Sequence, residues 1–121
     1  THYEGCQVNI CLNYGGRDEI TRAVRALAAE CIKEGRDPAS ITEQDISDRL
    51  FSAGVPDPDL IIRPSGELRL SNFLLWQCAY AEFYFCDTLW PDFTEKEFDK
   101  ALIAYQHRER RFGGLKQEKQ K

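Results

Sequence analysis

The segment richest in potential chemistry runs from Arg63 to Asn72, with the sequence RPSGELRLSN. It offers two guanidinium groups, two hydroxyls and a glycine within a short span. Arginine binds phosphate oxygens through paired, charge-assisted hydrogen bonds, and hydroxyls add neutral donors. These residues alone leave two interpretations open. One is a phosphate site, and the other is a solvated loop whose arginines pair with Glu67 and Asp59.

A second candidate is Glu82, which lies inside the otherwise apolar run YAEFYF. A carboxylate in such surroundings is costly unless it pairs with a cation or binds a metal ion. Mg²⁺ would fit, because it takes few protein carboxylates and completes its shell with substrate phosphates and water. The residues alone favour the alternative, a structural ion pair with one of the arginines.

The remaining motifs give weaker evidence for a functional site. The glycine turn NYGGR, Asn13 to Arg17, has neither the G-x-G-x-x-G spacing of a dinucleotide fold nor the Gly-Lys-Ser/Thr of a P-loop. His2 and His107 are isolated in the sequence, so no Ser/His/Asp or Cys/His arrangement can be assembled from them.

Composition limits the class of protein. A chain of 121 residues with 42% hydrophobic and 30% charged residues is typical of one soluble domain. No apolar run approaches the roughly 20 residues of a membrane-spanning helix. The net charge of −4 argues against a general nucleic-acid binder. Clustered Arg108, Arg110 and Arg111 on this acidic background suit a small anionic ligand better.

The five cysteines are odd in number and form no C-x-x-C pair. This pattern favours reduced cysteines in the core over disulfides or a zinc site, and therefore a reducing compartment such as the cytosol.

The elements that must position these groups follow from hydrophobic periodicity. Strands are expected over 7–12, 60–62 and 81–85, the second buried on both faces. Helices are expected from about 18 to 34, from 42 to about 53, over 73–78, and from 94 toward 111. Strands separated by helices predict a layered α/β fold with a mainly parallel sheet flanked by helices. A polar, mobile tail is expected over 115–121.

Local signals fix several helix ends and faces. Thr42 with Asp45, and Thr94 with Glu97, are each predicted to form a capping box. Gly35 is expected to end the first helix. The first and last helices should bury the residues that recur at helical spacing, namely Ile20, Val24, Leu27 and Cys31 in the first, and Phe98, Leu102 and Tyr105 in the last. Ser71 and Asn72 should expose backbone N–H groups at the start of the short helix over 73–78.

The order and spacing of several motifs, taken together, closely resemble the cis-prenyltransferase family of the undecaprenyl diphosphate synthase type. The resemblance spans residues 8 to 114. It is carried by NYGGR, DLIIR continuing through SGE, Arg69 and SNFLLWQ, then YAE, WPDF and RRFGG. It implies that residues 1–114 are the C-terminal part of a single catalytic domain.

The family extends an allylic diphosphate, such as farnesyl diphosphate, with isopentenyl diphosphate in cis geometry and needs Mg²⁺. The product is a polyprenyl diphosphate lipid carrier used for cell-wall precursors. The resemblance implies a homodimer. The cysteine pattern favours a cytoplasmic location, with peripheral membrane association left open, and the net charge argues against a nucleic-acid partner. By this resemblance the substrate-binding residues are Arg63, Arg69, Ser71, Arg111 and Gly113, and Glu82 is the metal ligand. By the same resemblance, Arg111 and Gly113 are expected to belong to an element that completes the site of the neighbouring subunit.

Two departures from the family pattern matter. Pro64 stands where Thr is common, which removes a hydroxyl and an N–H. The family's N-terminal region, with its catalytic aspartate, has no counterpart among these residues, so none of them is assigned a catalytic role and the chain alone is expected to be inactive. The alternative is a non-catalytic partner subunit of a heteromeric enzyme. Retention of Arg63, Arg69, Ser71 and Glu82 favours the enzyme.

Overall fold

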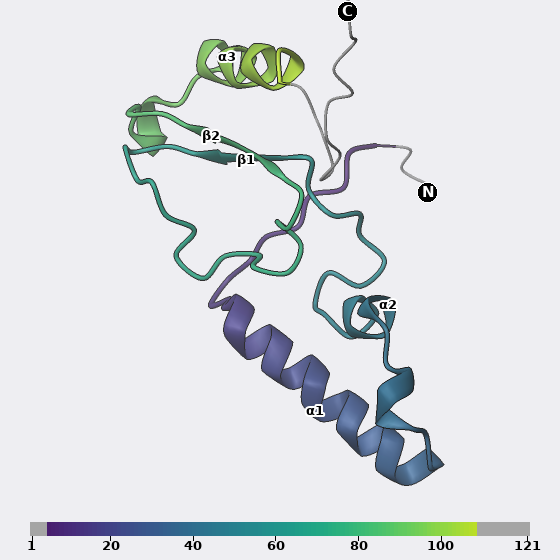
Figure 1. Cartoon of the computed structure of the whole chain (residues 1–121). Helices are drawn as coiled ribbons and strands as arrows, with labels where there is room; N and C mark the ends of the chain where they lie inside the picture. Colours follow the sequence, from purple (N-terminus) through teal and green to yellow (C-terminus); the bar gives the residue numbers. More distant parts are fainter. Residues whose placement is uncertain (1–4, 109–121) are drawn as a thin grey trace, which may run out of the picture. The chain divides into compact units, whose positions relative to one another are not determined.

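The computed structural model describes residues 5–108 (Figure 1). The chain divides into two compact units. One contains the helices α1 (Gly16–Glu34) and α2 (Glu43–Ser47) together with Asn72–Leu74. The other contains the strands β1 (Leu60–Arg63) and β2 (Glu82–Phe85) and the helix α3 (Glu95–Gln106). Two short 3₁₀ turns, η1 (Pro38–Ser40) and η2 (Trp90–Asp92), complete the elements of the described residues.

The two strands form a parallel pair, which confirms the predicted α/β class. Leu60 lies opposite Glu82 and Arg63 opposite Phe85, and α3 packs against β2. The prediction that β1 is buried on both faces is wrong, because all four of its residues are only partly buried. In the described part of the chain β1 has one neighbouring strand, so its other edge is not paired with a strand there.

The strand predicted over 7–12 does not form. Its apolar residues Val8, Ile10 and Leu12 are 76%, 78% and 83% exposed. The alternation of side chains satisfies only half of what a strand needs, because a strand also requires a neighbour for its backbone hydrogen bonds. Within residues 5–108 this segment has no such neighbour.

Helix α1 buries a stripe that is shifted from the predicted one. Glu19, Ala23, Leu27 and Cys31, each four residues apart, are buried, whereas Val24 is 51% exposed. The hydrophobic pattern excluded Glu19 because it is charged, and this displaced the predicted face. Gly35 ends the helix as predicted, with φ of 66° and its N–H donating to the carbonyl of Cys31.

Helix α2 begins as predicted and ends early. Thr42 and Asp45 form the expected capping box. The helix stops at Ser47, however, and not near residue 53. The backbone N–H groups of Arg49, Leu50 and Ala53 donate to carbonyls three residues back, the pattern of tight 3₁₀-type turns.

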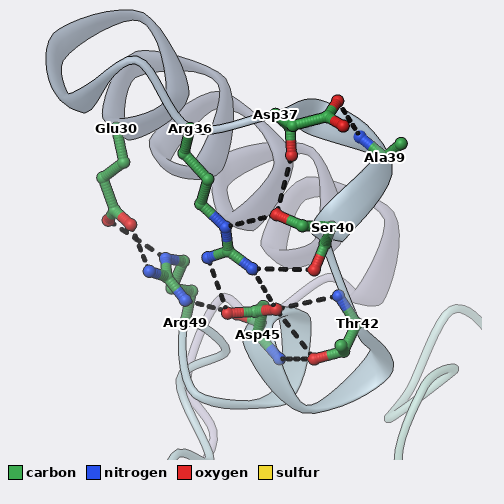
Figure 2. Close-up of polar contacts among 8 residues, drawn as sticks. All are labelled: Glu30, Arg36, Asp37, Ala39, Ser40, Thr42, Asp45 and Arg49. Atoms are coloured by element: carbon green, nitrogen blue, oxygen red, sulfur yellow. Dashed lines mark hydrogen bonds and ion pairs between the residues drawn. The ribbon is translucent and has the colours of Figure 1, made fainter.

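A polar network joins the end of α1, η1 and α2 (Figure 2). The guanidinium of Arg36 makes two hydrogen bonds to the carboxylate of Asp45, at 2.9 and 2.7 Å, and a third to Ser40 Oγ at 3.0 Å. Arg49 pairs in the same two-point manner with Glu30. Asp45 also accepts from the N–H and the hydroxyl of Thr42 at 2.8 and 2.7 Å. These contacts fix α2 against the last turns of α1.

Replacing Thr42 with alanine should lower the free energy of unfolding by about 1 kcal/mol, because the side-chain bond to the Asp45 N–H is lost. Thr94→Ala is the matched control, since Thr94 is the N-cap of α3 but makes no side-chain cap bond. Urea denaturation followed by circular dichroism measures both. Equal losses at the two positions would contradict the cap assigned to Thr42.

Lowering the pH should reduce the stability of the unit that contains α1 and α2, because Asp45 loses its charge. Hydrogen bonding from Arg36, and then from the N–H and hydroxyl of Thr42, holds the pKa of the Asp45 carboxyl well below its usual range. A pKa depressed on folding stabilises the native state above the unfolded value, about 3.9, and this contribution is lost as the pH falls below it. Thermal unfolding between pH 6 and 2 should therefore show a smaller loss of stability on acidification in Asp45→Asn than in the wild type. Asp48→Asn, an exposed acid next to the same helix, should leave the acid dependence of the wild type in place.

The C-terminal helical predictions are partly wrong. Residues 73–78 form turns and not a helix. Thr94 caps α3 without its side chain, and Glu97 bonds instead to Lys100 and Thr88. The buried residue of α3 is Ala101, while Phe98 and Leu102 are 46% and 37% exposed. The predicted continuation to Arg111 and the tail over 115–121 lie outside the described residues.

All five cysteines are free, in agreement with the prediction that they are reduced. Only Cys31 and Cys78 are buried, however, and Cys6 and Cys11 are exposed, so the core location holds for part of the set. Burial raises the pKa of the Cys78 thiol. Within residues 5–108 there is no cluster of three metal-ligating side chains, and no helix there has the length and apolar character to cross a bilayer.

Candidate functional site

The candidate loop leaves the sheet at the carboxyl end of β1, the position at which parallel sheets present ligand-binding residues. Its first residues remain attached to the chain that follows β2. The N–H of Ser65 donates to the carbonyl of Thr88 at 2.8 Å, and that of Gly66 donates to the carbonyl of Cys86 at 2.9 Å. The Cys86 N–H in turn donates to the carbonyl of Arg63 at 3.1 Å. The base of the loop is therefore held firmly by backbone hydrogen bonds.

The turn itself requires left-handed backbone. Ser65 and Gly66 have φ values of 71° and 67°. At Gly66 a side chain would also meet Asp87, since an added Cβ would lie 3.3 Å from its Oδ1 atom. Glycine thus suits the left-handed backbone, and a side chain here would require a small shift of Asp87.

Arg63 and Ser71 come together across this loop. The Nη2 atom of Arg63 lies 3.5 Å from the Ser71 hydroxyl, at the limit of a hydrogen bond. Arg63 is partly buried as the last residue of β1, which orders its backbone, while Ser71 is exposed. A guanidinium beside an exposed hydroxyl provides two hydrogen-bond donors that suit an anionic oxygen.

Arg69 pairs with Glu67 within the same loop, and its side chain is 68% exposed. This is the ion pair that the solvated-loop interpretation expects. Exposed ion pairs contribute little, about 0–1 kcal/mol. A diphosphate could therefore take the place of Glu67 as the partner of Arg69 at small cost.

Glu82 lies apart from Arg63. Paired residues of neighbouring strands share a face, so Glu82 lies on the face of Leu60, while Arg63 lies on the opposite face with Phe85. Three residues separate the two positions along the ladder, which is about 10 Å. The carboxylate of Glu82 accepts from Arg108 Nη1 at 3.0 Å. The structure thus contains the ion pair that the residues alone favoured for Glu82.

Arg108 is a residue whose role the sequence did not reveal. Arg108 lies just beyond the end of α3. Besides pairing with Glu82, it donates through Nη2 to the carbonyl of Phe83 at 2.9 Å. Its position in a basic cluster was visible in the sequence, but its partner was not. The other candidates of that region, Arg111 and Gly113, lie outside the described residues.

Asn72 is the second residue that the sequence analysis undervalued. Its carbonyl accepts from the Gly16 N–H at 2.7 Å, and its Oδ1 accepts from the Arg17 N–H at 2.9 Å. The prediction that Ser71 and Asn72 open a helix is wrong, since both have positive φ and turns follow. The available signal was that α1 starts at two glycines, which have no side chain to cap it.

The residues near β2 provide the smallest number of ligands with which a protein binds a magnesium ion, a single carboxylate. Glu82 offers one carboxylate with 23% of its side chain exposed, already shared with Arg108. Mg²⁺ commonly takes one or two protein carboxylates and completes its octahedral shell with water and phosphate oxygens.

Comparison with known proteins identifies the family of this chain. The family described as "Putative undecaprenyl diphosphate synthase" matches residues 1–113. An isoprenyl transferase of Listeria monocytogenes is 55% identical over 114 residues, which cover 94% of this chain and 45% of the relative. An isoprenyl transferase of Thermus thermophilus is 54% identical, with 92% and 44% covered. The chain thus spans less than half the length of these relatives.

Two solved structures are similar in fold. Lavandulyl diphosphate synthase from Lavandula x intermedia, in complex with dimethylallyl diphosphate, gives a TM-score of 0.77 at 45% identity, covering 83% of this chain and 43% of that one. A probable undecaprenyl diphosphate synthase from Campylobacter jejuni gives 0.67 at 41% identity, covering 84% and 45%. The matched family, the relatives and the shared parallel α/β fold lead to one conclusion: this chain belongs to the undecaprenyl diphosphate synthase family of cis-prenyltransferases.

Proposed function

We propose that this chain supplies the isopentenyl-diphosphate-binding part of a cis-prenyltransferase that extends an allylic diphosphate into a polyprenyl diphosphate. The observation that carries the proposal is the Arg63–Ser71 pair at the carboxyl end of β1. Two donors on one ordered loop can bind adjacent oxygens of a diphosphate, and Arg69 in the same loop adds a second guanidinium.

Binding the diphosphate of isopentenyl diphosphate would orient its double bond. Holding two reactants in a fixed geometry removes much of the entropic barrier to their condensation. The residues of this chain would therefore act by positioning. The departing diphosphate of the allylic substrate also develops negative charge, which favours cationic surroundings.

Mg²⁺ is proposed as the cofactor, with Glu82 as its ligand. When bound, the ion would neutralise diphosphate charge. To bind the ion, the Glu82 carboxylate would have to be released by Arg108, with which it forms an ion pair of 3.0 Å. We also propose a homodimer, in which Arg111 and Gly113 contribute to the neighbouring subunit's site, as the family resemblance implies.

Calorimetric titration of the chain with isopentenyl diphosphate, with and without Mg²⁺, tests the proposal. Saturable binding that inorganic pyrophosphate displaces is the expected result. Absence of binding at millimolar ligand would refute the assigned role. An assay with farnesyl diphosphate added should give no product from this chain alone, since the catalytic aspartate of the family has no counterpart here.

The second candidate is a non-catalytic partner subunit of a heteromeric enzyme. Such a subunit has no need to hold a diphosphate, so it should fail the titration. The Arg63–Ser71 pair favours the enzyme over this alternative.

A further inference from the structure

The end of α3 is joined to β2 by an ion pair that uses the carboxylate proposed for a metal ion. Arg108 Nη1 donates to Glu82 Oε2 at 3.0 Å. Both residues belong to the unit that contains the strands, in which α3 packs against β2. Arg108 follows the last turn of that helix, and its N–H donates to the Tyr105 carbonyl at 3.1 Å. The carboxylate of Glu82 is therefore already compensated by a cation of the same unit.

The guanidinium of Arg108 is also held by a second bond that does not involve the Glu82 carboxylate. Its Nη2 donates to the carbonyl of Phe83, the next residue of β2, at 2.9 Å. The Glu82 N–H donates to the Asp59 carbonyl at 2.9 Å, which fixes the backbone at the other end of the pair. A cation that approaches Glu82 thus meets a positive charge anchored to the strand, and the Phe83 carbonyl would keep that charge close after the carboxylate is released.

The two side chains of the pair differ in exposure, and this difference suits an exchange of partners. The Glu82 side chain is 23% exposed and that of Arg108 is 48% exposed. A carboxylate that is mostly removed from water needs a cation beside it. Ion pairs that solvent reaches are weak, so a half-exposed guanidinium can leave one readily. Glu82 therefore requires a positive partner, but that partner can be changed.

We propose that Arg108 is the internal counter-ion of Glu82: it competes with a divalent cation for the carboxylate and so sets how tightly this chain holds the ion. The inference rests on the proposed function, in which Glu82 is the metal ligand, and adds a regulator of that ligand. Binding the ion requires the Glu82–Arg108 pair to separate. The measured affinity is then lower than Glu82 alone would give, in proportion to the fraction of molecules in which the pair is open.

Mn²⁺ binding to the whole chain, followed by electron paramagnetic resonance without any diphosphate, tests the proposal. Mn²⁺ takes the same oxygen ligands as Mg²⁺. Arg108→Gln keeps a donor for the Phe83 carbonyl but removes the charge, and should raise the affinity for Mn²⁺ about three- to tenfold. Arg25→Gln, the same change at an exposed position of α1, is the matched control. It should leave the affinity within about twofold of wild type, because salt screens distant charges.

A double-mutant cycle with Glu82→Gln shows whether the effect passes through this carboxylate. The chain carries other acidic residues to which Mn²⁺ can bind, but the loss of Arg108 should not change binding there. The gain in affinity should therefore disappear when Arg108→Gln is made in the Glu82→Gln background. Unchanged or weaker Mn²⁺ binding in Arg108→Gln, an equal gain in Arg25→Gln, or a gain that persists without the Glu82 carboxylate would overturn the inference.

A measurement on the wild type decides the question if circular dichroism shows that Arg108→Gln does not fold. The side-chain Nε–H resonance of Arg108 in NMR spectra should shift as Mg²⁺ is added, because the guanidinium loses the carboxylate as its partner. The corresponding resonance of Arg25 should stay in place. An Arg108 resonance that does not move throughout the Mg²⁺ titration would also overturn the inference.

Failure of this inference can be told from failure of the proposed function, which is measured separately with isopentenyl diphosphate. If the wild type binds that ligand and Arg108→Gln leaves the Mn²⁺ affinity unchanged, only the role of Arg108 is refuted. If the wild type does not bind isopentenyl diphosphate but Arg108→Gln tightens Mn²⁺ binding through Glu82, the diphosphate site is refuted and the competition between Arg108 and the cation stands.

Discussion

Replacing Arg63 with alanine is expected to lower the affinity of the chain for isopentenyl diphosphate by roughly 10- to 150-fold. Hydrogen bonds to charged groups contribute about 1.5–3 kcal/mol, and an arginine can give two to one phosphate. Arg63 ends β1, and its carbonyl is held by the Cys86 N–H, so the neighbouring backbone should not move to compensate. Titration calorimetry at fixed ionic strength measures the change.

Arg25→Ala provides the control for this experiment. Arg25 is an exposed arginine of α1, and its loss changes the net charge by the same amount. Long-range attraction of an anion by overall charge would make the two variants alike, whereas a specific contact affects Arg63 alone. A loss below twofold in Arg63→Ala, or an equal loss in Arg25→Ala, would contradict the assigned contact.

The features that the sequence predicted correctly are those with local causes. The capping box of Thr42 and Asp45 and the left-handed Gly35 depend on residues within one turn of a helix end. The apolar runs that became β1 and β2 are likewise read from adjacent residues. Each of these signals is complete within a few positions, so no knowledge of the fold is needed to interpret it.

Several of the features that were missed depend on partners far away in the sequence, although the local capping box of Thr94 and Glu97 also failed. A strand was expected over 7–12 from alternation alone, but strand formation needs a neighbour that alternation does not supply. The cap of α1 comes from Asn72, which no local pattern links to Gly16. The short helix over 73–78 failed for a related reason, since Asn72 and Leu74 adopt positive φ, which a right-handed helix excludes.

In the candidate site, too, local features were easier to predict than features that depend on distant residues. The residue types of the loop after β1 left a phosphate site and a solvated loop open, and the structure brings Arg63 and Ser71 together while it pairs Arg69 with Glu67. The face on which Glu82 lies was not predictable, because it depends on the register of β2 against β1. A shift by one residue would have placed Glu82 on the face of Arg63.

Glu19 is a buried residue that no sequence signal marked as important. Its side chain is 1% exposed, in the same stripe of α1 as Ala23. One carboxyl oxygen accepts from the Phe51 N–H at 2.6 Å, and the other accepts from the Tyr14 hydroxyl. One side chain thus joins the start of α1 to the segment before it and to the turns after α2.

Glu19→Ala is therefore expected to lower the free energy of unfolding by about 2–4 kcal/mol. Two donors lose their acceptor at once, and each unsatisfied buried group costs about 1–3 kcal/mol. The vacated volume adds a cavity penalty, because packed interiors relax only partly. Urea denaturation followed by circular dichroism measures the change.

Asp18→Ala is the matched control, since Asp18 is the preceding residue in the same first turn and is exposed. Both substitutions remove one acid from the N-terminal turn, where carboxylates favour the helix. The difference between the two variants therefore separates the effect of charge from the effects of burial, namely the bonds to Tyr14 and Phe51 and the packing of the side chain. Glu19→Gln keeps the volume and one acceptor oxygen, and its stability should fall between those of the wild type and Glu19→Ala. Similar losses in Asp18→Ala and Glu19→Ala would mean that helix charge, and not the buried hydrogen bonds, determines the contribution of Glu19.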